Sequence, residues 1–355
     1  MNLLIVNAGS SSLKLRVLSD SDEVISEQDV SDWDGSAESL SDALEAHPAD
    51  AVVHRVVHGG ERFDGAALVD DEVEAAIEEL VPLAPLHQPR ALELIRRTRS
   101  AGDRPVVACF DTSYHRTIPA AAATYALPAQ WRQRFGLRKF GFHGLSHEYV
   151  ARRAPEVAGR ETPRLISCHL GAGASLCAIA AGRSVDTTMG FTPVDGLVMA
   201  TRSGSVDPGL LMWLQTEGGL TAEEISEALE HRSGLLGLSE KSGDLREVLG
   251  GLESESNRLA YEVYVYRMAG ELARMAAALG GVDAIAFTGG VGEHSAPLRA
   301  AVSRRLSWLG VHLDHEHNET TAPIISAPGA PVTVAVIPSR EDLTMATQAR
   351  ALLAA

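Results

Sequence analysis

Residues 3–18, LLIVNAGSSSLKLRVL, decide the fold. An apolar run at 3–6 is broken by the polar stretch NAGSSS, and residues 13–18 then alternate between apolar and basic side chains. This pattern predicts a strand, a tight turn and a second strand. Residues 165–180, LISCHLGAGASLCAIA, follow the same order, although the two turns share few identical residues. A strand–turn–strand unit near the start of each half predicts duplicated α/β domains.

The rest of the chain alternates predicted strands with predicted helices, as expected for α/β layers. Apolar runs predict strands at 51–57, 106–110, 284–287 and 332–337. Apolar spacing and composition predict helices at 70–81, 88–99, 221–231, 257–279 and 341–354. Residues 20–50 are acidic and polar with little periodicity, so we expect a surface connection there. The 355 residues suffice for about two domains, and no long Gly/Ser or Pro-rich linker separates them.

Composition excludes several partners. The net charge of −16 repels nucleic acid and anionic membranes, so we expect neither as a partner. Residues 1–20 do not resemble a signal peptide, and no apolar run reaches the ~18 residues of a membrane span. Three cysteines without a CxxC pair suit free thiols in a reducing compartment, which indicates a cytoplasmic protein.

Three turns of small residues could cradle phosphate through converging backbone N–H groups. The first contains Asn7, Ser10 and Ser12 and is followed by Lys14; the others are GAGAS at 171–175 and TGGVG at 288–292. None matches the Walker or GxGxxG pattern. One such turn alone is more often a plain hairpin, but three in one α/β chain favour a nucleotide site.

Two arginines occupy unusual positions. Arg55 lies inside an otherwise apolar strand in AVVHRVVHGG, and Arg202 lies among small residues in TRSG. A guanidinium in an apolar strand is costly unless it is paired, and its planar fork suits carboxylate or phosphate. The alternative for Arg55 is a structural ion pair with Asp111 or Glu61.

Carboxylates and histidines offer further candidates. Asp111 and Glu341 each follow a predicted strand, where a carboxylate suits Mg²⁺, although helix capping would also explain either residue. His143 precedes a glycine in a loop, where an imidazole could stabilise a transferring phosphoryl group. Zinc has little support, because HExxH and a cysteine cluster are both absent.

Taken together, ten motifs resemble the acetate kinase family in order and spacing. They are NAGSSSLK at 7–14, HRVVHGG at 54–60, LAPLHQP at 83–89, FDTSYH at 110–115, GFHGLSH at 141–147, CHLGAGAS at 168–175, DTTMGFTPVDGL at 186–197, TRSGSVDPG at 201–209, SGLLGLSEKSGDLR at 233–246 and FTGGVGEHS at 287–295. The resemblance covers essentially the whole chain.

The resemblance implies an α/β fold of two duplicated actin-like (ribonuclease H-like) domains that flank an active-site cleft. The expected domains are residues 1–115 with 344–355, and residues 116–343, the second carrying the nucleotide site and the dimer contacts. The family implies a homodimer that uses Mg²⁺ (or Mn²⁺) and transfers a phosphoryl group in line from ATP to acetate, giving acetyl phosphate and ADP.

Roles for individual residues follow from the same resemblance. Arg55 and Arg202 resemble the pair that clamps the carboxylate and the moving phosphoryl group, which His143 also contacts. The residues that resemble those organising Mg²⁺ and phosphate are Asn7, Asp111 and Glu341. Those of the first phosphate turn are Ser10, Ser12 and Lys14. On the nucleotide side the matching positions are His169, Gly171, Gly173, Asp244, Leu245, Arg246, Gly290, Val291, Gly292 and His294. On the acetate side they are Val57, Leu86, His87, Phe142 and Pro193.

Four positions depart from the family pattern and keep alternatives open. The second turn has alanines where the family has asparagine and serine, an alanine precedes Arg202, and the third turn ends in histidine; these residues are Ala172, Ala174, Ala200 and His294. The donor is therefore ATP, another nucleotide or pyrophosphate. Val57 leaves little room and favours acetate over a longer acid, although one methylene discriminates by only about 1–3 kcal/mol. A catalytically weak actin-like nucleotide-binding protein is the alternative of another class.

Overall fold

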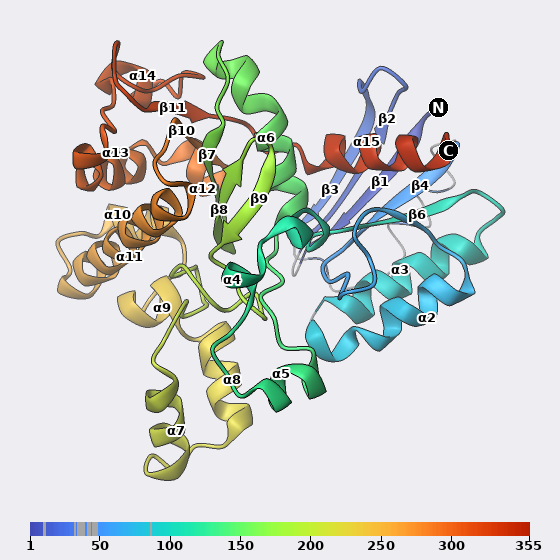
Figure 1. The fold of residues 1–355 in the computed structure, drawn as a ribbon, viewed down its shortest axis with the longest axis horizontal. Coiled ribbons are helices and arrows are strands. Elements are labelled where there is room, and N and C mark those ends of the chain that lie inside the picture. Colours follow the sequence, from blue (N-terminus) through green and yellow to red (C-terminus); the bar gives the residue numbers. More distant parts are fainter. Residues whose placement is uncertain (10–11, 32, 34–39, 41–43, 45–48, 86) are drawn as a thin grey trace. The chain divides into compact units, whose positions relative to one another are not determined.

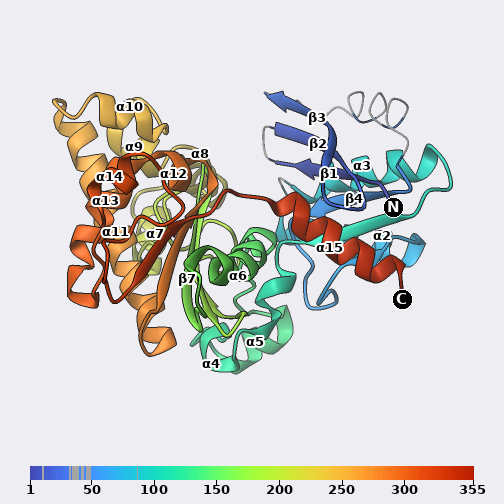
Figure 2. The same cartoon turned by 90° about the horizontal axis from the view of Figure 1, so that it is seen from above.

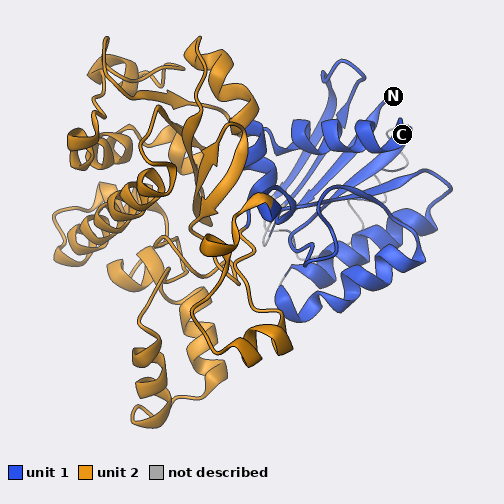
Figure 3. Ribbon diagram, viewed as in Figure 1, with its two compact units in different colours: residues 1–116, 142–149, 340–355 blue, residues 117–141, 150–339 orange. Residues whose placement is uncertain are grey.

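The computed structural model describes residues 1–9, 12–31, 33, 40, 44, 49–85 and 87–355. The chain divides into two compact units, and each has its own β-sheet (Figures 1 and 3). Unit 1 comprises Met1–Arg116, Phe142–Tyr149 and Arg340–Ala355, and unit 2 comprises Thr117–Gly141 and Val150–Ser339. Unit 1 therefore also holds residues 116, 142–149 and 340–343, which the sequence analysis assigns to the second domain.

Unit 1 is built on a six-stranded sheet in the order β3-β2-β1-β4-β6-β5. Its strands are β1 (Leu3–Ala8), β2 (Ser12–Leu18), β3 (Val24–Ser31), β4 (Ala51–Val56), β5 (Ala67–Leu68) and β6 (Val106–Phe110). β1 pairs antiparallel with β2 and parallel with β4, which in turn pairs parallel with β6. The two strands predicted at the start of the chain are confirmed, and residues 10–11 of the turn between them lie outside the described residues.

Helices cover both faces of this sheet, which explains why its central strands are apolar on both sides. Leu3 and Ile5 pack with Met345 of α15 (Glu341–Leu353), which lies along one face of the sheet (Figure 2). Leu4 and Val6 on the opposite face share a cluster with Leu94 of α3 (Gln88–Ser100). Among the described residues, two further elements lie wholly within unit 1: α2 (Asp71–Glu79) and the 3₁₀ helix η1 (Val81–Leu83).

Unit 2 repeats the same connectivity in a five-stranded sheet, ordered β11-β10-β7-β8-β9. Its strands are β7 (Arg164–Leu170), β8 (Ala174–Ala180), β9 (Arg183–Thr187), β10 (Ala284–Thr288) and β11 (Thr333–Val336). β7 pairs antiparallel with β8 and parallel with β10, as β1 does with β2 and β4. The duplication that the sequence only weakly indicated is thus explicit in the two sheets.

The helices of unit 2 vary greatly in length. They are α4 (Ala120–Ala123), α5 (Ala129–Phe135), α7 (Pro208–Thr216), α8 (Ala222–His231), α9 (Gly234–Ser239), α10 (Leu245–Gly250), α11 (Glu255–Leu279), α12 (Gly289–His294), α13 (Ala296–Arg305), η3 (Ser307–Leu309) and α14 (His315–Glu319). Both η2 (Ser113–Thr117) and α6 (Gly144–Ala158) contain a boundary between the units. Among the described residues, no helix has the length and apolar character needed to cross a bilayer.

The expectation of a plain surface connection at 20–50 is wrong for residues 24–31. These residues form β3, which pairs antiparallel with β2 along its length. Its sequence, VISEQDVS, does not alternate between apolar and polar residues. The strand lies at the sheet edge, where even Val24 and Ile25 are exposed to solvent. Hydrogen bonds to β2 therefore hold this strand, and a pattern based on side chains could not reveal them. Trp33, also within 20–50, is buried in the core of unit 1.

Candidate functional site

Four polar side chains from distant parts of the chain meet in unit 1. Arg55 donates to Asp111 from both Nε (3.1 and 3.0 Å) and Nη2 (2.6 Å). Its Nη1 donates to Asn7 Oδ1 at 3.1 Å and lies 3.8 Å from Glu341 Oε2. Asn7 Nδ2 completes the cluster by donating to Glu341 Oε2 at 2.8 Å. We call these four residues the charged cluster.

The sheet brings the charged cluster together. Asn7 is in β1, Arg55 is in β4, and Asp111 directly follows β6. Because these three strands run parallel, their carboxyl ends lie at one edge of the sheet, where α/β proteins place their ligands. Glu341 joins them as the first residue of α15. The ion pair that sequence offered as an alternative for Arg55 is formed, and Asp111 is its partner.

The cluster holds two carboxylates and one guanidinium in a buried setting. Burial raises the pKa of Asp111 to about 6, a rise that Arg55 opposes and Glu341 reinforces. Burial alone would lower the pKa of Arg55, but Asp111 and Glu341 outweigh it and the pKa rises. Two carboxylates beside one guanidinium leave the cluster with surplus negative charge, which a cation would relieve.

A glycine fixes the histidine loop beside Asp111. The Gly144 N–H donates to the Asp111 carbonyl oxygen at 2.8 Å. A Cβ atom on residue 144 would lie 2.2 Å from that same oxygen, so only glycine fits. His143, the preceding residue, has a φ of +56°, which costs a non-glycine residue about 1–3 kcal/mol and is typical of functional sites. The sequence therefore places His143 next to the charged cluster at a conformational cost.

Part of the expected acetate pocket lies nearby in unit 1. Phe142 is fully buried, and its carbonyl oxygen lies 2.9 Å from His115 Nε2, so this nitrogen carries a hydrogen. The Phe142 ring meets the edge of the His58 ring at 5.6 Å between centroids. Burial lowers the pKa of His58 to about 4 and keeps this side chain neutral. Val57, which follows β4, is also buried.

The other expected residues of unit 1 lie apart or outside the description. Leu86 and Ser10 fall outside the described residues. Ser12 is the first residue of β2, and Lys14 is exposed further along this strand, opposite Asn7 in the β1–β2 register. His87 is the half-buried residue before α3.

Unit 2 contains a pocket of about 760 Å³. This volume is in the usual range for a small-molecule or cofactor site. Its lining includes seven of the expected nucleotide-side residues, and one of these seven, His294, is also a departure from the family pattern. Two further departures lie in the lining as well. The expected residues are Gly171, Asp244, Leu245, Arg246, Gly290, Val291 and His294, and the two further departures are Ala172 and Ala200. Gly173 and Gly292 lie in the turn and helix that contribute these residues.

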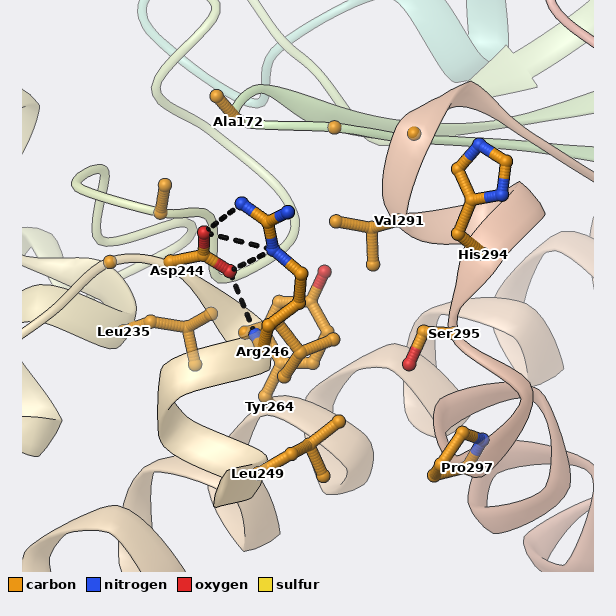
Figure 4. A pocket seen from close by; sticks show the side chains of 15 residues that line it. Ala172, Leu235, Asp244, Arg246, Leu249, Tyr264, Val291, His294, Ser295 and Pro297 are labelled. Atoms are coloured by element: carbon orange, nitrogen blue, oxygen red, sulfur yellow. Dashed lines mark hydrogen bonds and ion pairs between the residues drawn. The ribbon is translucent and has the colours of Figure 1, made fainter. Parts of the chain in front are cut away.

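The walls of this pocket are mostly apolar, with polar groups at opposite sides. Figure 4 shows Asp244 and Arg246 on one side, and His294 and Ser295 on the other. Asp244 caps α10 by accepting from Arg246 N at 2.8 Å and pairs with the Arg246 guanidinium, whose Nη2 lies 2.5 Å from Oδ2. The hydrogen bond from Arg246 lowers the pKa of Asp244. Tyr264 forms part of the wall between the two sides.

Two buried hydroxyl groups of unit 2, one of them in the pocket lining, lack partners among the described residues. Ser295 Oγ, in the pocket lining, and Thr288 Oγ1, at the start of α12, are buried without a hydrogen-bond partner among the described residues. Buried hydroxyls are normally satisfied, and an orphaned one is costly. The Ser295 hydroxyl, which lines the pocket, is therefore suited to bind a polar ligand.

The remaining expected residues of unit 2 lie in loops and strands. Arg202 Nη1 is 3.4 Å from the Pro193 carbonyl oxygen, so these two residues are neighbours. Burial lowers the pKa of Arg202, an effect that Glu230 opposes. His169 is half-buried in β7, opposite Ser175 of β8 and Thr288 of β10. The structure thus gathers the expected residues into two groups, one in each unit.

The charged cluster fits the Mg²⁺ that the resemblance implies. It offers an amide oxygen and two carboxylates, which are hard ligands, and it has surplus negative charge. Within the described part of the chain, no three His, Cys, Asp or Glu side chains are arranged to hold a metal by themselves. Mg²⁺ commonly binds through one or two carboxylates together with water and phosphate. A zinc cage of protein ligands has no support among the described residues.

Sequence reasoning missed residues that support the site. Gly144, His115 and His58 position the loop at 142–143, and Tyr264 and Ser295 line the pocket of unit 2. Ser295 directly follows the third small-residue turn, so its position was a usable signal. Tyr264 lies within the long helix α11, where its sequence context resembles that of any core residue.

Comparison with known proteins gives consistent matches. The acetokinase family model matches residues 39–347. An acetate kinase of Deinococcus radiodurans is 49% identical over 307 residues, which are 84% of this chain and 77% of that protein. The crystal structure of Porphyromonas gingivalis acetate kinase superposes with a TM-score of 0.91 at 35% identity and 99% coverage of both chains. That of a propionate kinase from Francisella tularensis gives 0.90 at 32% identity and 98% coverage of both.

These similarities define the class first and then the family. The two sheets with equivalent connectivity, and their agreement with these solved kinases, show an actin-like α/β fold of the kind found in sugar kinases. The chain belongs to the acetokinase family.

Proposed function

We propose that this protein catalyses the reversible transfer of a phosphoryl group from ATP to acetate, giving acetyl phosphate and ADP. The observation that carries the proposal is the charged cluster, in which Arg55 is held by Asp111 and Asn7 at the edge of the sheet. Family membership and the pocket of unit 2 support it.

The reaction needs charge neutralisation and alignment more than a base, because acetate is already ionised at neutral pH. One acetate oxygen attacks the γ-phosphorus while the bond to the bridging oxygen of ADP breaks, so no proton moves. Arg55 is fixed by four hydrogen bonds and keeps its charge, so it stabilises anionic oxygens without reorganising. His143, which precedes the glycine bonded to Asp111, would contact the same oxygens. Bound Mg²⁺, held through Asn7, Asp111 and Glu341, would neutralise charge on the phosphates.

The pocket of unit 2 supports a nucleotide as the donor rather than pyrophosphate. Apolar residues such as Leu235, Leu249, Val291 and Pro297 dominate its walls, and they suit a base and ribose. Pyrophosphate has no apolar part to bury, so it would not use these walls. Ala172 and Ala200 lie in the lining, and the Ala200 N–H donates to the Ala172 carbonyl oxygen at 3.1 Å. A backbone hydrogen bond thus joins the two alanines in this part of the pocket wall.

Formation of acyl phosphate, trapped as the hydroxamate, tests the proposal directly. The assay contains acetate and Mg²⁺ with either ATP or pyrophosphate, and propionate replaces acetate in a parallel series. We expect product with ATP and a preference of roughly tenfold or more for acetate, the scale of one methylene. Product with pyrophosphate alone would overturn the donor. No product from folded protein would favour the nucleotide-binding alternative.

We further infer a homodimer formed through α7. This helix has no buried residues, and Leu210, Met212 and Trp213 are 47%, 58% and 56% exposed. Adjacent apolar side chains at this exposure are typical of protein–protein contacts. Cys109, Cys168 and Cys177 form no disulfide, which supports a cytoplasmic location, since reducing compartments keep thiols from forming disulfides.

Substitution Trp213→Glu tests the dimer. A carboxylate in an apolar contact is costly, so we expect the molar mass from light scattering after size exclusion to fall from two chains to one. Thr216→Glu, at an exposed position on the same helix, adds the same charge and serves as the control. A dimeric Trp213→Glu variant would exclude α7 as the interface.

A further inference from the structure

The helix that lines the pocket of unit 2 is tied to the segment that leads into the charged cluster. Glu293, in α12, accepts a hydrogen bond from the Ser339 backbone N–H through Oε1 at 2.9 Å. Its neighbours Val291 and His294 line the pocket, whereas Glu293 does not. The short helix α12 thus carries residues that line the pocket and also Glu293, whose carboxylate binds the Ser339 backbone N–H.

Ser339 is the last residue of unit 2, and unit 1 resumes at Arg340. The connection between β11 and α15 contains this junction (Figure 2). Arg340 is followed at once by Glu341, the carboxylate that accepts from Asn7 in the charged cluster. Two peptide bonds therefore separate the atom held by Glu293 from a residue expected to organise Mg²⁺ and phosphate.

The connection is fixed on both sides of one residue. Beyond the junction, Arg340 pairs with Asp342 through Nε (2.9 and 3.0 Å) and Nη2 (2.9 Å) at the start of α15. The Arg340 backbone, at φ −139° and ψ +61°, is neither helical nor extended. Residues at element ends that absorb changes in φ and ψ act as hinges. Because Glu293 binds Ser339 and Asp342 binds the Arg340 side chain, changes in φ and ψ at this junction are expected mainly in the backbone around Arg340.

α12 is itself braced on its other side. Arg299 is fully buried, and its Nη1 donates to the carbonyl oxygens of Gly292 (2.9 Å) and Glu293 (2.7 Å). Its Nη2 donates to the Asn318 carbonyl oxygen at 2.7 Å. These bonds fix the backbone from which the Glu293 side chain reaches Ser339.

We propose that Glu293 is a positioning residue that couples nucleotide binding at α12 to the placement of Glu341. A ligand that contacts Gly290, Val291 or His294 shifts α12, Glu293 transmits the shift to Ser339, and the junction at Arg340 passes it to Glu341. This inference rests on the proposed function, since it takes the ligand of the pocket to be a nucleotide. It adds a residue that touches neither the pocket nor the charged cluster.

Two substitutions of similar size separate this role from a structural one. Glu293→Gln keeps an oxygen acceptor for the Ser339 N–H, whereas Glu293→Met removes it. The first readout needs no catalysis: hydrogen exchange of peptides covering residues 338–346, with and without ADP. We expect ADP to slow exchange there in the wild type and in Glu293→Gln but not in Glu293→Met.

The second readout is steady-state kinetics in the hydroxamate assay. Losing a hydrogen bond to a charged acceptor changes an equilibrium by about ten- to a hundredfold, so we expect kcat of Glu293→Met to fall by that factor. KM for ATP and the dissociation constant of ADP should stay within about threefold of the wild type, since the pocket lining is intact.

The possible outcomes distinguish the coupling from the reaction. An ADP effect on exchange at 338–346 that survives in Glu293→Met would overturn the coupling, as would a loss confined to ADP affinity. A Glu293→Met variant with wild-type kcat would do the same. An inactive wild type that shows the ADP effect on exchange would overturn the proposed reaction and leave the coupling supported.

Discussion

The charged cluster of unit 1 and the pocket of unit 2 treat their polar groups in opposite ways. In the cluster, the polar groups of Arg55, Asp111, Asn7 and Glu341 are hydrogen-bonded to one another. In the pocket, Ser295 Oγ is buried without a partner among the described residues. The cluster is therefore preorganised for chemistry, while the pocket keeps hydrogen-bonding capacity for a ligand. Four predictions test this contrast.

The largest effect should come from Arg55→Lys, which keeps the charge and loses the planar fork. One ammonium group cannot reproduce four hydrogen bonds to Asp111 and Asn7, so we expect kcat to fall by about 10²–10³. Arg62→Lys is the matched control, because Arg62 pairs with Glu72 at an exposed site. An Arg55→Lys variant with more than about a tenth of wild-type kcat would contradict preorganisation.

The pH profile should show the surplus negative charge of the cluster. Since the pKa of Asp111 is raised to about 6, its carboxylate protonates as pH falls through 6 and loses its pairing with Arg55. We expect kcat/KM to fall by about tenfold per pH unit below that value. Mg²⁺ competes with the proton, so raising its concentration should move the break to lower pH. If the pH at which kcat/KM begins to fall does not change with Mg²⁺ concentration, the cation does not bind at Asp111.

Substitution of Ser295 in the pocket should affect stability and ligand affinity in opposite directions. Ser295→Ala removes a buried hydroxyl without a partner, so the free energy of unfolding should stay constant or rise by about 1 kcal/mol. The affinity for ADP, measured by calorimetry, should fall by about fivefold or more. Ser239→Ala is the control: this buried hydroxyl donates to the Ser242 carbonyl oxygen at 2.8 Å, so its loss should destabilise the protein. Equal destabilisation by both substitutions would show that Ser295 is satisfied.

The smallest effect should come from Arg246→Ala. The Arg246 side chain is 91% exposed, and its pairing with Asp244 is screened by water, in contrast to the Arg55–Asp111 pair. We expect KM for ATP to change by less than about fivefold, with kcat unchanged. A loss near that of Arg55→Lys would mean that Arg246 contacts the phosphates when ligand is bound.

The sequence allowed prediction of those parts of the fold in which side chains reveal their surroundings. Leu13, Leu15 and Val17 alternate with basic residues, and β2 buries all three. β3 could not be predicted, because an edge strand held by backbone pairing needs no apolar pattern. The same limit hid α5, which has no buried residues and therefore no periodic stripe.

The candidate site was predictable for residues whose chemistry conflicts with their setting. An arginine inside an otherwise apolar strand had to be paired, and the structure pairs Arg55 with Asp111. Glu293 offered no such conflict, since a glutamate in a short polar segment is ordinary. Its contact with Ser339 joins positions 46 residues apart, and only the packing of β10 beside β11 brings them together. The assignment of roles to these residues stays a prediction.

Gly144 also sets a rule for diversifying this protein. Any side chain at this position would collide with the main chain of Asp111, displacing one end of the ion pair and the strained His143 together. A mutant library aimed at longer carboxylic acids should therefore vary Val57 and leave codon 144 fixed. Random mutagenesis of the whole gene would waste every clone that changes this codon, however favourable its other substitutions.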